Sequence, residues 1–122
     1  MKIVRSKDCG NSPKNQLAEN LSVALATGDA VTLAGLLTDE AEWRILGVGE
    51  LRGRDAIVGA LARMGIRGST LTVTHVVSHG RAGAVNGVVE RRDGNTHFCD
   101  VLEFANAKAT SIARITSYRI ES

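Results

Sequence analysis

The stretch Thr-His-Phe-Cys-Asp-Val-Leu-Glu-Phe, residues 96–104, decides which fold this sequence predicts. Its residues alternate in character, and neighbouring residues of a strand point to opposite sides of a sheet. One face of the strand therefore carries Phe98, Asp100, Leu102 and Phe104. A carboxylate among large apolar side chains must reach a cavity, pair with a buried donor or stay protonated, because burying an unpaired charge is costly. We therefore expect an inward-facing strand with one acidic group.

The rest of the second half also has a hydrophobic period of two, which is typical of strands. It predicts strands over residues 71–79, 82–92 and 111–120 around the one at 96–105. Asp93-Gly94 is a strong hairpin signal, and the other connections are also short enough for a meander. A connection over residues 106–110 precedes the last strand.

The first half has helical spacing instead. Ser12-Pro13 supplies an N-cap and a first-turn proline for a helix that ends near Thr27-Gly28. A short second helix over residues 30–37, capped by Asp29, and a third over residues 54–64 follow the same logic. Between them, residues 42–45 alternate as a strand, and glycines 47, 49 and 53 surround a hairpin-like turn. Helices followed by an antiparallel sheet predict an α+β domain with the helices on one face of the sheet.

Length and composition limit the possible classes of protein. A chain of 122 residues predicts one domain, here residues 12–122 after an extended arm at residues 1–11. No apolar run reaches the length of a membrane span, and residues 1–14 lack a signal-peptide type of segment, so we expect a cytoplasmic protein. The 15 basic and 13 acidic residues are scattered, which gives nucleic-acid binding little support. Cys9 and Cys99 are far apart and fit two reduced thiols.

Several short motifs occur in a characteristic order along the chain. They are Gly28-Asp29, Thr-Asp-Glu-Ala-Glu-Trp at 38–43, Leu-Arg-Gly-Arg-Asp-Ala-Ile at 51–57, Asp-Val-Leu-Glu-Phe at 100–104 and Ile-Thr-Ser-Tyr at 115–118. With them the sequence resembles the nuclear-transport-factor-2-like superfamily, in particular its bacterial SnoaL-like branch. Gly-Asn-Ser-Pro-Lys-Asn at 10–15 and Gly-Ala-Val-Asn-Gly at 83–87 resemble uncharacterised bacterial members more narrowly.

The resemblance implies a cone-shaped, strongly curved, mostly antiparallel sheet that three helices close around an apolar cavity. It also implies a homodimer that packs outer sheet face against outer sheet face. The side chains expected around the cavity are Trp43, Ile45, Val85, Gly87, Phe98, Leu102, Phe104 and Ile115, which we predict to contact a small, largely apolar ligand. Gly83 and Gly87 either ease the curvature of their strand or leave room for that ligand.

Asp100 is the first candidate for catalysis. It falls where the steroid isomerases of the superfamily keep a carboxylic acid protonated as a hydrogen-bond donor. The positions that match their base and their tyrosine carry Ile45 and Leu21, so a steroid isomerase mechanism is not expected. Two interpretations of Asp100 stay open: an acid or base in a ligand pocket, or a core carboxyl that bonds a backbone donor or a nearby histidine.

Two histidines are further catalytic candidates. By simple alternation His75 and His79 share the face of Leu71, Val73 and Val77, so either one could form an acid/base pair with Asp100. The alternative is an ordinary core or rim histidine, particularly for His79 beside a turn. Trp43 likewise either stacks on a ligand or simply fills the core. No two histidines have metal-ligand spacing with a carboxylate, so we expect neither a metal nor another cofactor.

These residues leave three functions open. The first is an enzyme that moves protons on a small apolar molecule, of isomerase, dehydratase or cyclase type. The second is a non-catalytic module that binds a ligand or dimerises. The third, an adaptor that binds other proteins through the outer sheet face, has no exposed motif in its favour.

Overall fold

The computed structural model describes residues 1–106, 108 and 110–122. Two residues of the predicted 106–110 connection, 107 and 109, lie outside this described part. The elements along the chain are β1 (Lys2–Val4), α1 (Pro13–Thr27), α2 (Ala30–Leu36), β2 (Leu37–Ile45), β3 (Gly49–Arg52), α3 (Arg54–Met64), β4 (Thr70–His79), β5 (Ala82–Arg91), β6 (Gly94–Phe104) and β7 (Ile112–Glu121).

The helices begin and end at the signals that the sequence carries. The hydroxyl of Ser12 accepts a hydrogen bond from the Asn15 backbone, and Pro13 occupies the first turn of α1. Gly28 ends α1 in the left-handed conformation, with φ of 75° and its N–H bonded to the carbonyl of Ala24. Asp29 caps α2 in the same way as Ser12 caps α1. All three predicted helices are confirmed.

The strands form one sheet in the order β1-β4-β5-β6-β7-β2-β3. The four strands from β4 to β7 pair antiparallel, as predicted, but β2 pairs parallel with β7 and β1 pairs parallel with β4. The sheet is therefore mixed. β2 is also longer than the predicted strand, because it begins at Leu37, directly where α2 ends.

A β-bulge interrupts β4 and changes the direction of its second half. Val73 pairs with Gly87 and His75 with Asn86, so Thr74 is an extra residue without a partner. After the bulge, Val76 is buried in the core, and Val77 is 59% exposed. The prediction that Val77 and the histidines share the inward face is wrong, because one inserted residue exchanges the two faces of the strand.

The N-terminal arm is tied to the body of the domain. Besides the pairing of β1 with β4, the carboxylate of Asp8 accepts the backbone N–H of Val76 at the bulge, 3.0 Å away. Glu19 of α1 is buried and binds Arg5 and the backbone N–H of Ser6, both at 2.9 Å. The arm therefore satisfies polar groups that the bulge and the helix would otherwise leave unpaired.

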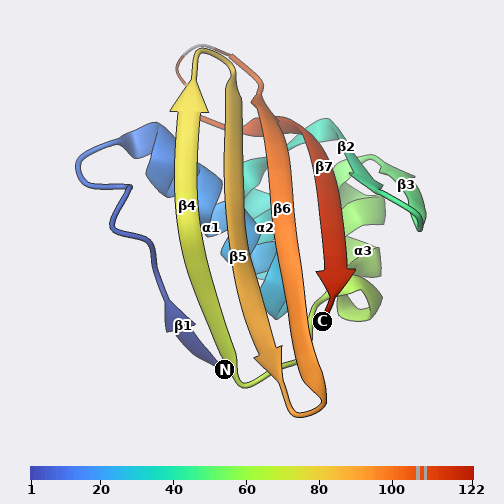
Figure 1. Ribbon diagram of the computed structural model, residues 1–122. Coiled ribbons are helices and arrows are strands. Elements are labelled where there is room, and N and C mark those ends of the chain that lie inside the picture. The colour runs from blue at the N-terminus through green and yellow to red at the C-terminus, as the bar shows by residue number, and fades with distance from the viewer. Residues whose placement is uncertain (107, 109) are drawn as a thin grey trace.

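All three helices lie against one face of the curved, open sheet, and the opposite face of β4 to β7 is uncovered (Figure 1). The core fills the space between helices and sheet. Its largest fully buried side chains come from every layer and include Trp43, Phe104, Leu21, Leu25, Leu33, Ile57, Leu61, Leu71 and Leu102. This arrangement confirms an α+β domain with the helices gathered on one side.

Candidate functional site

Asp100 lies inside the domain, on the side of β6 that faces the helices. Its side chain is buried, with 2% of its surface exposed, and Phe98, Leu102 and Phe104 on the same face are also buried. On the neighbouring strand β7, Ser117 is the register partner of Asp100. The alternation of residues 96–104 thus placed the acid on the correct face, and its buried partners come from other segments of the chain.

Asp100 belongs to a short chain of hydrogen bonds in the core. The indole Nε1–H of Trp43 donates to Ser117 Oγ over 2.8 Å, and Ser117 Oγ–H donates to Asp100 Oδ1 over 2.6 Å. Trp43 comes from β2, which reaches this position through its parallel pairing with β7. The indole donor and one carboxyl oxygen are therefore satisfied within the core, as buried polar groups require.

Two more polar groups lie close to the acid. Ser22 of α1 is fully buried, and its hydroxyl makes no hydrogen bond of normal geometry with the described residues, yet it is near enough to affect the carboxyl of Asp100. Arg119 lies two residues beyond Ser117 on β7, half-buried, with its guanidinium carbon 5.7 Å from the centre of the Trp43 ring. Neither Ser22 nor Arg119 was predicted. The helical position of Ser22 among buried neighbours was the available signal, but no periodicity shows which strand it faces.

Burial decides the ionisation of Asp100. Loss of hydration raises the pKa of the Asp100 carboxyl above its ordinary value. The hydroxyls of Ser117 and Ser22 and the positive charge of Arg119 act in the opposite direction, but their effects are smaller. A carboxyl that keeps its proton can donate a hydrogen bond or a proton, which an ionised one cannot.

We expect Asp100→Asn to change how the free energy of unfolding varies with pH. In the unfolded chain the carboxyl titrates near about 3.9, whereas burial raises its pKa in the folded protein. The folded protein therefore keeps the proton in a pH window where the unfolded chain has released it. As pH rises through that window, the wild type loses up to about 1.4 kcal/mol of stability per pH unit, and asparagine removes this loss.

Urea unfolding at a series of pH values from about 4 upward checks the expectation, because it yields the free energy of unfolding directly. Asp55→Asn is the matched control, since Asp55 is an exposed acid in the first turn of α3. If the stability of Asp100→Asn and that of the wild type keep a constant difference across the series, Asp100 does not retain a proton on folding.

The predicted ligand contacts are buried and closely packed, and two of them, Gly87 and Phe98, also border the hollow on the outer sheet face. Trp43, Ile45, Val85, Phe98, Leu102, Phe104 and Ile115 each have at most 4% of their surface exposed. The two glycines of β5 give no extra room: a Cβ on Gly87 would lie 2.3 Å from the carbonyl oxygen of Thr72, and one on Gly83 would lie 3.4 Å from the Phe104 ring. Among the described residues, Asp100 lines none of the five pockets of about 220 to 680 Å³. The ligand-contact role of these residues stays a prediction.

The histidines lie on the other side of the sheet from Asp100. The bulge turns His75 outward, where its Nδ1 lies 3.3 Å from Asp8 Oδ2 and its backbone N–H donates to Asn86 Oδ1 over 3.0 Å. His79 is exposed at the end of β4. A hydrogen-bonded pair between Asp100 and either histidine is therefore not formed, and the prediction of a shared face was wrong because it took β4 as regular.

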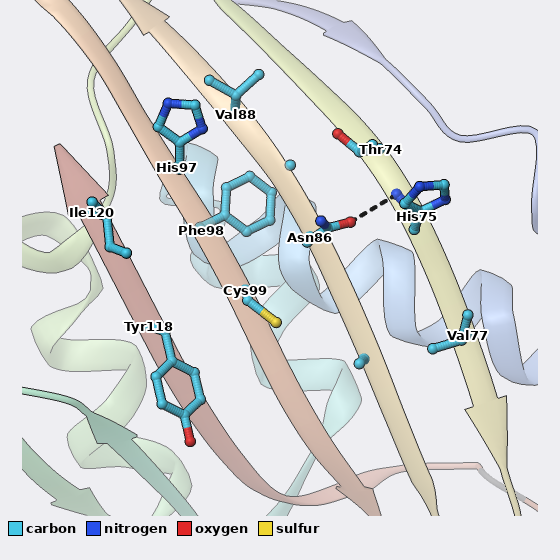
Figure 2. A pocket seen from close by; sticks show the side chains of 12 residues that line it. Thr74, His75, Val77, Asn86, Val88, His97, Phe98, Cys99, Tyr118 and Ile120 are labelled. Carbon is cyan, nitrogen blue, oxygen red and sulfur yellow. Dashed lines mark hydrogen bonds between the residues drawn. The ribbon is translucent and has the colours of Figure 1, made fainter. Parts of the chain in front are cut away.

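The uncovered sheet face carries a broad apolar hollow of about 680 Å³ (Figure 2). Side chains from β4, β5, β6 and β7 surround it, among them His75, Val77, Val88, Cys99, Tyr118 and Ile120. Ile120 is 69% exposed and Tyr118 is 46% exposed. Burial raises the pKa of the Cys99 thiol, so it is less reactive than an ordinary cysteine.

Within the part of the chain that the structure describes, no three His, Cys, Asp or Glu side chains gather closely enough to hold a metal ion. In the same part, every helix is too short or too polar to cross a membrane.

The curved open sheet and the helices on one face of it define the nuclear-transport-factor-2-like class of fold, as predicted. Residues 18–112 match the family model described as the SnoaL-like domain, so the chain belongs to this family. No curated protein matches the sequence.

Solved structures with the same fold come from several bacteria. An NTF-2 like protein of unknown function from Burkholderia xenovorans LB400 has a TM-score of 0.75 and 14% identity, over 93% of this chain and 88% of that one. A protein proposed to be a ketosteroid isomerase, from Kribbella flavida DSM 17836, has a TM-score of 0.73 and 20% identity, over 89% and 78%. An LEH-like epoxide hydrolase from M. tuberculosis has a TM-score of 0.66 and 19% identity, over 88% and 82%. At such low identities the likeness shows the shared fold alone.

Proposed function

We propose that this SnoaL-like domain binds a small, largely apolar molecule against the interior acid, and that Asp100 donates a hydrogen bond or a proton to an oxygen of that molecule. The observation that carries the proposal is the buried carboxyl of Asp100 among large apolar side chains, where burial raises its pKa. Perturbed carboxyls of this kind are common at sites of general acid catalysis. The reactions that such a group serves include isomerisation, dehydration and cyclisation.

The hydrogen bonds around Asp100 fit the role of an acid. Ser117 donates to Oδ1, so Trp43 and Ser117 fix the carboxyl while the second oxygen keeps the transferable proton. The hydroxyl of Ser22 has no partner among the described residues and offers a second donor or acceptor beside it. Preorganised donors aimed at one oxygen stabilise the negative charge that develops on it.

A base is the part of the mechanism that the interior does not supply. Glu19 is the other buried carboxylate among the described residues, and Arg5 and the Ser6 backbone already occupy it. Proton removal from a ligand would therefore fall to water or to the ligand itself. Entry of a ligand would also displace packed side chains. Arg119 is a candidate for such a movement, because it lies between a surface pocket and the Trp43 ring.

Binding of two probes tests the first half of the proposal. Cyclohex-2-enone and phenol each carry one oxygen on a small apolar ring, and the fluorescence of Trp43, the single tryptophan of the chain, reports on a ligand near Asp100. We expect saturable binding that Asp100→Asn preserves, because its amide still donates, and that Asp100→Leu weakens by about tenfold. Asp55→Leu is the control at an exposed acid. Equal affinity in wild type and Asp100→Leu, or no saturable binding, would contradict the proposal.

Hydrogen exchange tests the catalytic half. In D₂O, an acid that protonates the ketone oxygen speeds the loss of an α-hydrogen to water, which proton NMR of the ketone follows. We expect the wild type to accelerate this exchange and Asp100→Asn, which has no acidic proton, to lose the acceleration. Binding without acceleration would support a non-catalytic ligand-binding module instead.

The uncovered sheet face favours a second property, a homodimer through that face. Large apolar side chains gather there without a covering layer: Val77, Val101, Tyr118 and Ile120 are each at least 40% exposed. Exposed apolar surface of this kind marks interfaces in many proteins. A second copy of the chain could cover the hollow of Figure 2 with the same surface, as two-fold symmetry allows.

We expect Ile120→Lys to shift the protein from dimer toward monomer, because a charge at the centre of the interface would be desolvated without a partner. Sedimentation equilibrium at several concentrations measures the change in dissociation constant. Val48→Lys is the matched control: Val48 and Ile120 are both 69% exposed, but Val48 lies in the turn between β2 and β3. A wild type that remains monomeric, or equal effects of the two lysines, would contradict the dimer.

A further inference from the structure

A small pocket lies between the end of α3 and the paired ends of β6 and β7, and it has a marked excess of positive charge. Its volume is about 220 Å³, and its charged lining consists of Arg67, Arg91, Arg119 and Glu121. Three guanidinium groups therefore face a single carboxylate. Such an excess of one sign in a concave site attracts ions of the opposite sign.

Arg119 is a half-buried cation of this pocket. Nη1 donates to the backbone carbonyl of Met64, and the guanidinium lies over the ring of Trp43. The buried Nε has no hydrogen-bond partner, and within the described residues no carboxylate oxygen lies within 4.0 Å of the group. Burial lowers the pKa of Arg119 from its ordinary value, because desolvation disfavours the cation. The carboxyls of Asp100 and Glu121 act in the opposite direction, but their effects are smaller.

The one carboxylate of the pocket is already committed to other groups. Glu121 forms an ion pair with Arg91 and accepts hydrogen bonds from the Thr96 hydroxyl at 3.1 Å. Arg91 also lies 3.4 Å from Asp93, yet its own Nε is buried without a partner. Glu121 thus acts on Arg119 only from beyond ion-pair distance. Among the described residues, the Nε–H groups of both Arg91 and Arg119 have no hydrogen-bond partner.

We propose that this pocket binds a small oxyanion, a carboxylate or a phosphate group, held mainly by Arg119 with Arg67 at the rim. Planar guanidinium groups bind both kinds of oxyanion through paired N–H donors. A carboxylate and a phosphate group share this chemistry, because each presents two or more oxygens that carry one or two negative charges. The anion supplies a counter-charge at contact distance, which no carboxylate of the described residues gives to Arg119. This inference concerns a different pocket from the one proposed at Asp100, and its test with Arg67→Gln changes no residue of that interior site.

Fluorescence of Trp43 reports binding, because the guanidinium that would contact the anion lies 5.7 Å from the ring centre. Titrations with sodium phosphate and sodium acetate, each against sodium chloride at equal ionic strength, separate specific binding from charge screening. We expect a saturable change with at least one oxyanion, in the range of about 1 mM for a site of this size. A response to phosphate alone identifies a phosphate site, and a response to acetate alone identifies a carboxylate site.

Three variants complete the test. Arg119→Gln is expected to abolish the saturable response, and Arg67→Gln, at an exposed residue whose loss does not threaten folding, to weaken it about tenfold. Arg114→Gln is the matched control. Arg114 is an exposed arginine of β7, the strand that also carries Arg119, but it pairs with Glu42 and Glu103. A response equal to that of chloride, or one that Arg67→Gln and Arg119→Gln leave unchanged, overturns the proposal.

Discussion

Replacing Trp43 by alanine is expected to lower the free energy of unfolding by about 3–5 kcal/mol. The indole is fully buried and is the largest side chain of the core, so its removal leaves a void that the surrounding strands cannot close. The substitution also removes the donor of the bond to Ser117, the first link of the chain that ends at Asp100. Urea unfolding followed by circular dichroism measures the loss, since the variant has no tryptophan to follow.

Trp43→Phe separates the two causes. It keeps most of the apolar volume and removes only the N–H donor, so we expect it to cost about 1–2 kcal/mol, less than half of the alanine effect. A loss of under about 1 kcal/mol for alanine would show that the indole is not packed as described.

After Trp43→Ala, we expect Gly87→Ala to cause the next largest loss in the free energy of unfolding. The new Cβ would lie 2.3 Å from the carbonyl oxygen of Thr72 and 2.8 Å from the Phe98 ring. Because the first of these atoms belongs to the backbone of β4, the clash is relieved only by moving two paired strands next to the bulge. Overpacking of this kind costs about 1–3 kcal/mol, and we expect the upper end or more.

Gly59→Ala serves as the control for Gly87→Ala. Gly59 is an exposed residue inside α3, and a Cβ there would have no neighbour within 4 Å. Alanine favours the helix and reduces the freedom of the unfolded chain, so this variant should gain up to about 1 kcal/mol. Thermal unfolding of both variants in parallel gives the comparison, and similar stabilities would mean that β4 and β5 do not approach as closely as described.

Sequence reasoning predicted the elements well where local chemistry determines them. The proline and cap of α1, the helical stripe of α3 and the alternation of β6 are each encoded by residues close together in the sequence. The inward position of Asp100 followed from the same alternation. Such local signals are strong because propensity, pattern and capping agree with one another.

The features that the sequence did not predict depend on contacts between distant segments. The bulge at Thr74 adds one residue to β4 without any change in composition, and it moved both histidines to the outer face. The parallel pairing of β2 with β7 brings Trp43 to Ser117, 74 residues apart, and no periodicity encodes such a partner. The close packing around Gly87 depends on how neighbouring volumes fit together, which a pattern of residues cannot give.

The ionisation of Asp100 is the property on which the proposed function depends most directly. The side-chain carboxyl carbon of Asp100, observed by NMR in protein labelled with carbon-13 and assigned by its loss in Asp100→Asn, titrates with the pKa of that group alone. Burial in the apolar wall predicts a midpoint clearly above the ordinary value of about 3.9. A midpoint at or below that value would show that Asp100 is ionised in the folded protein at neutral pH, and it would then have no proton to donate.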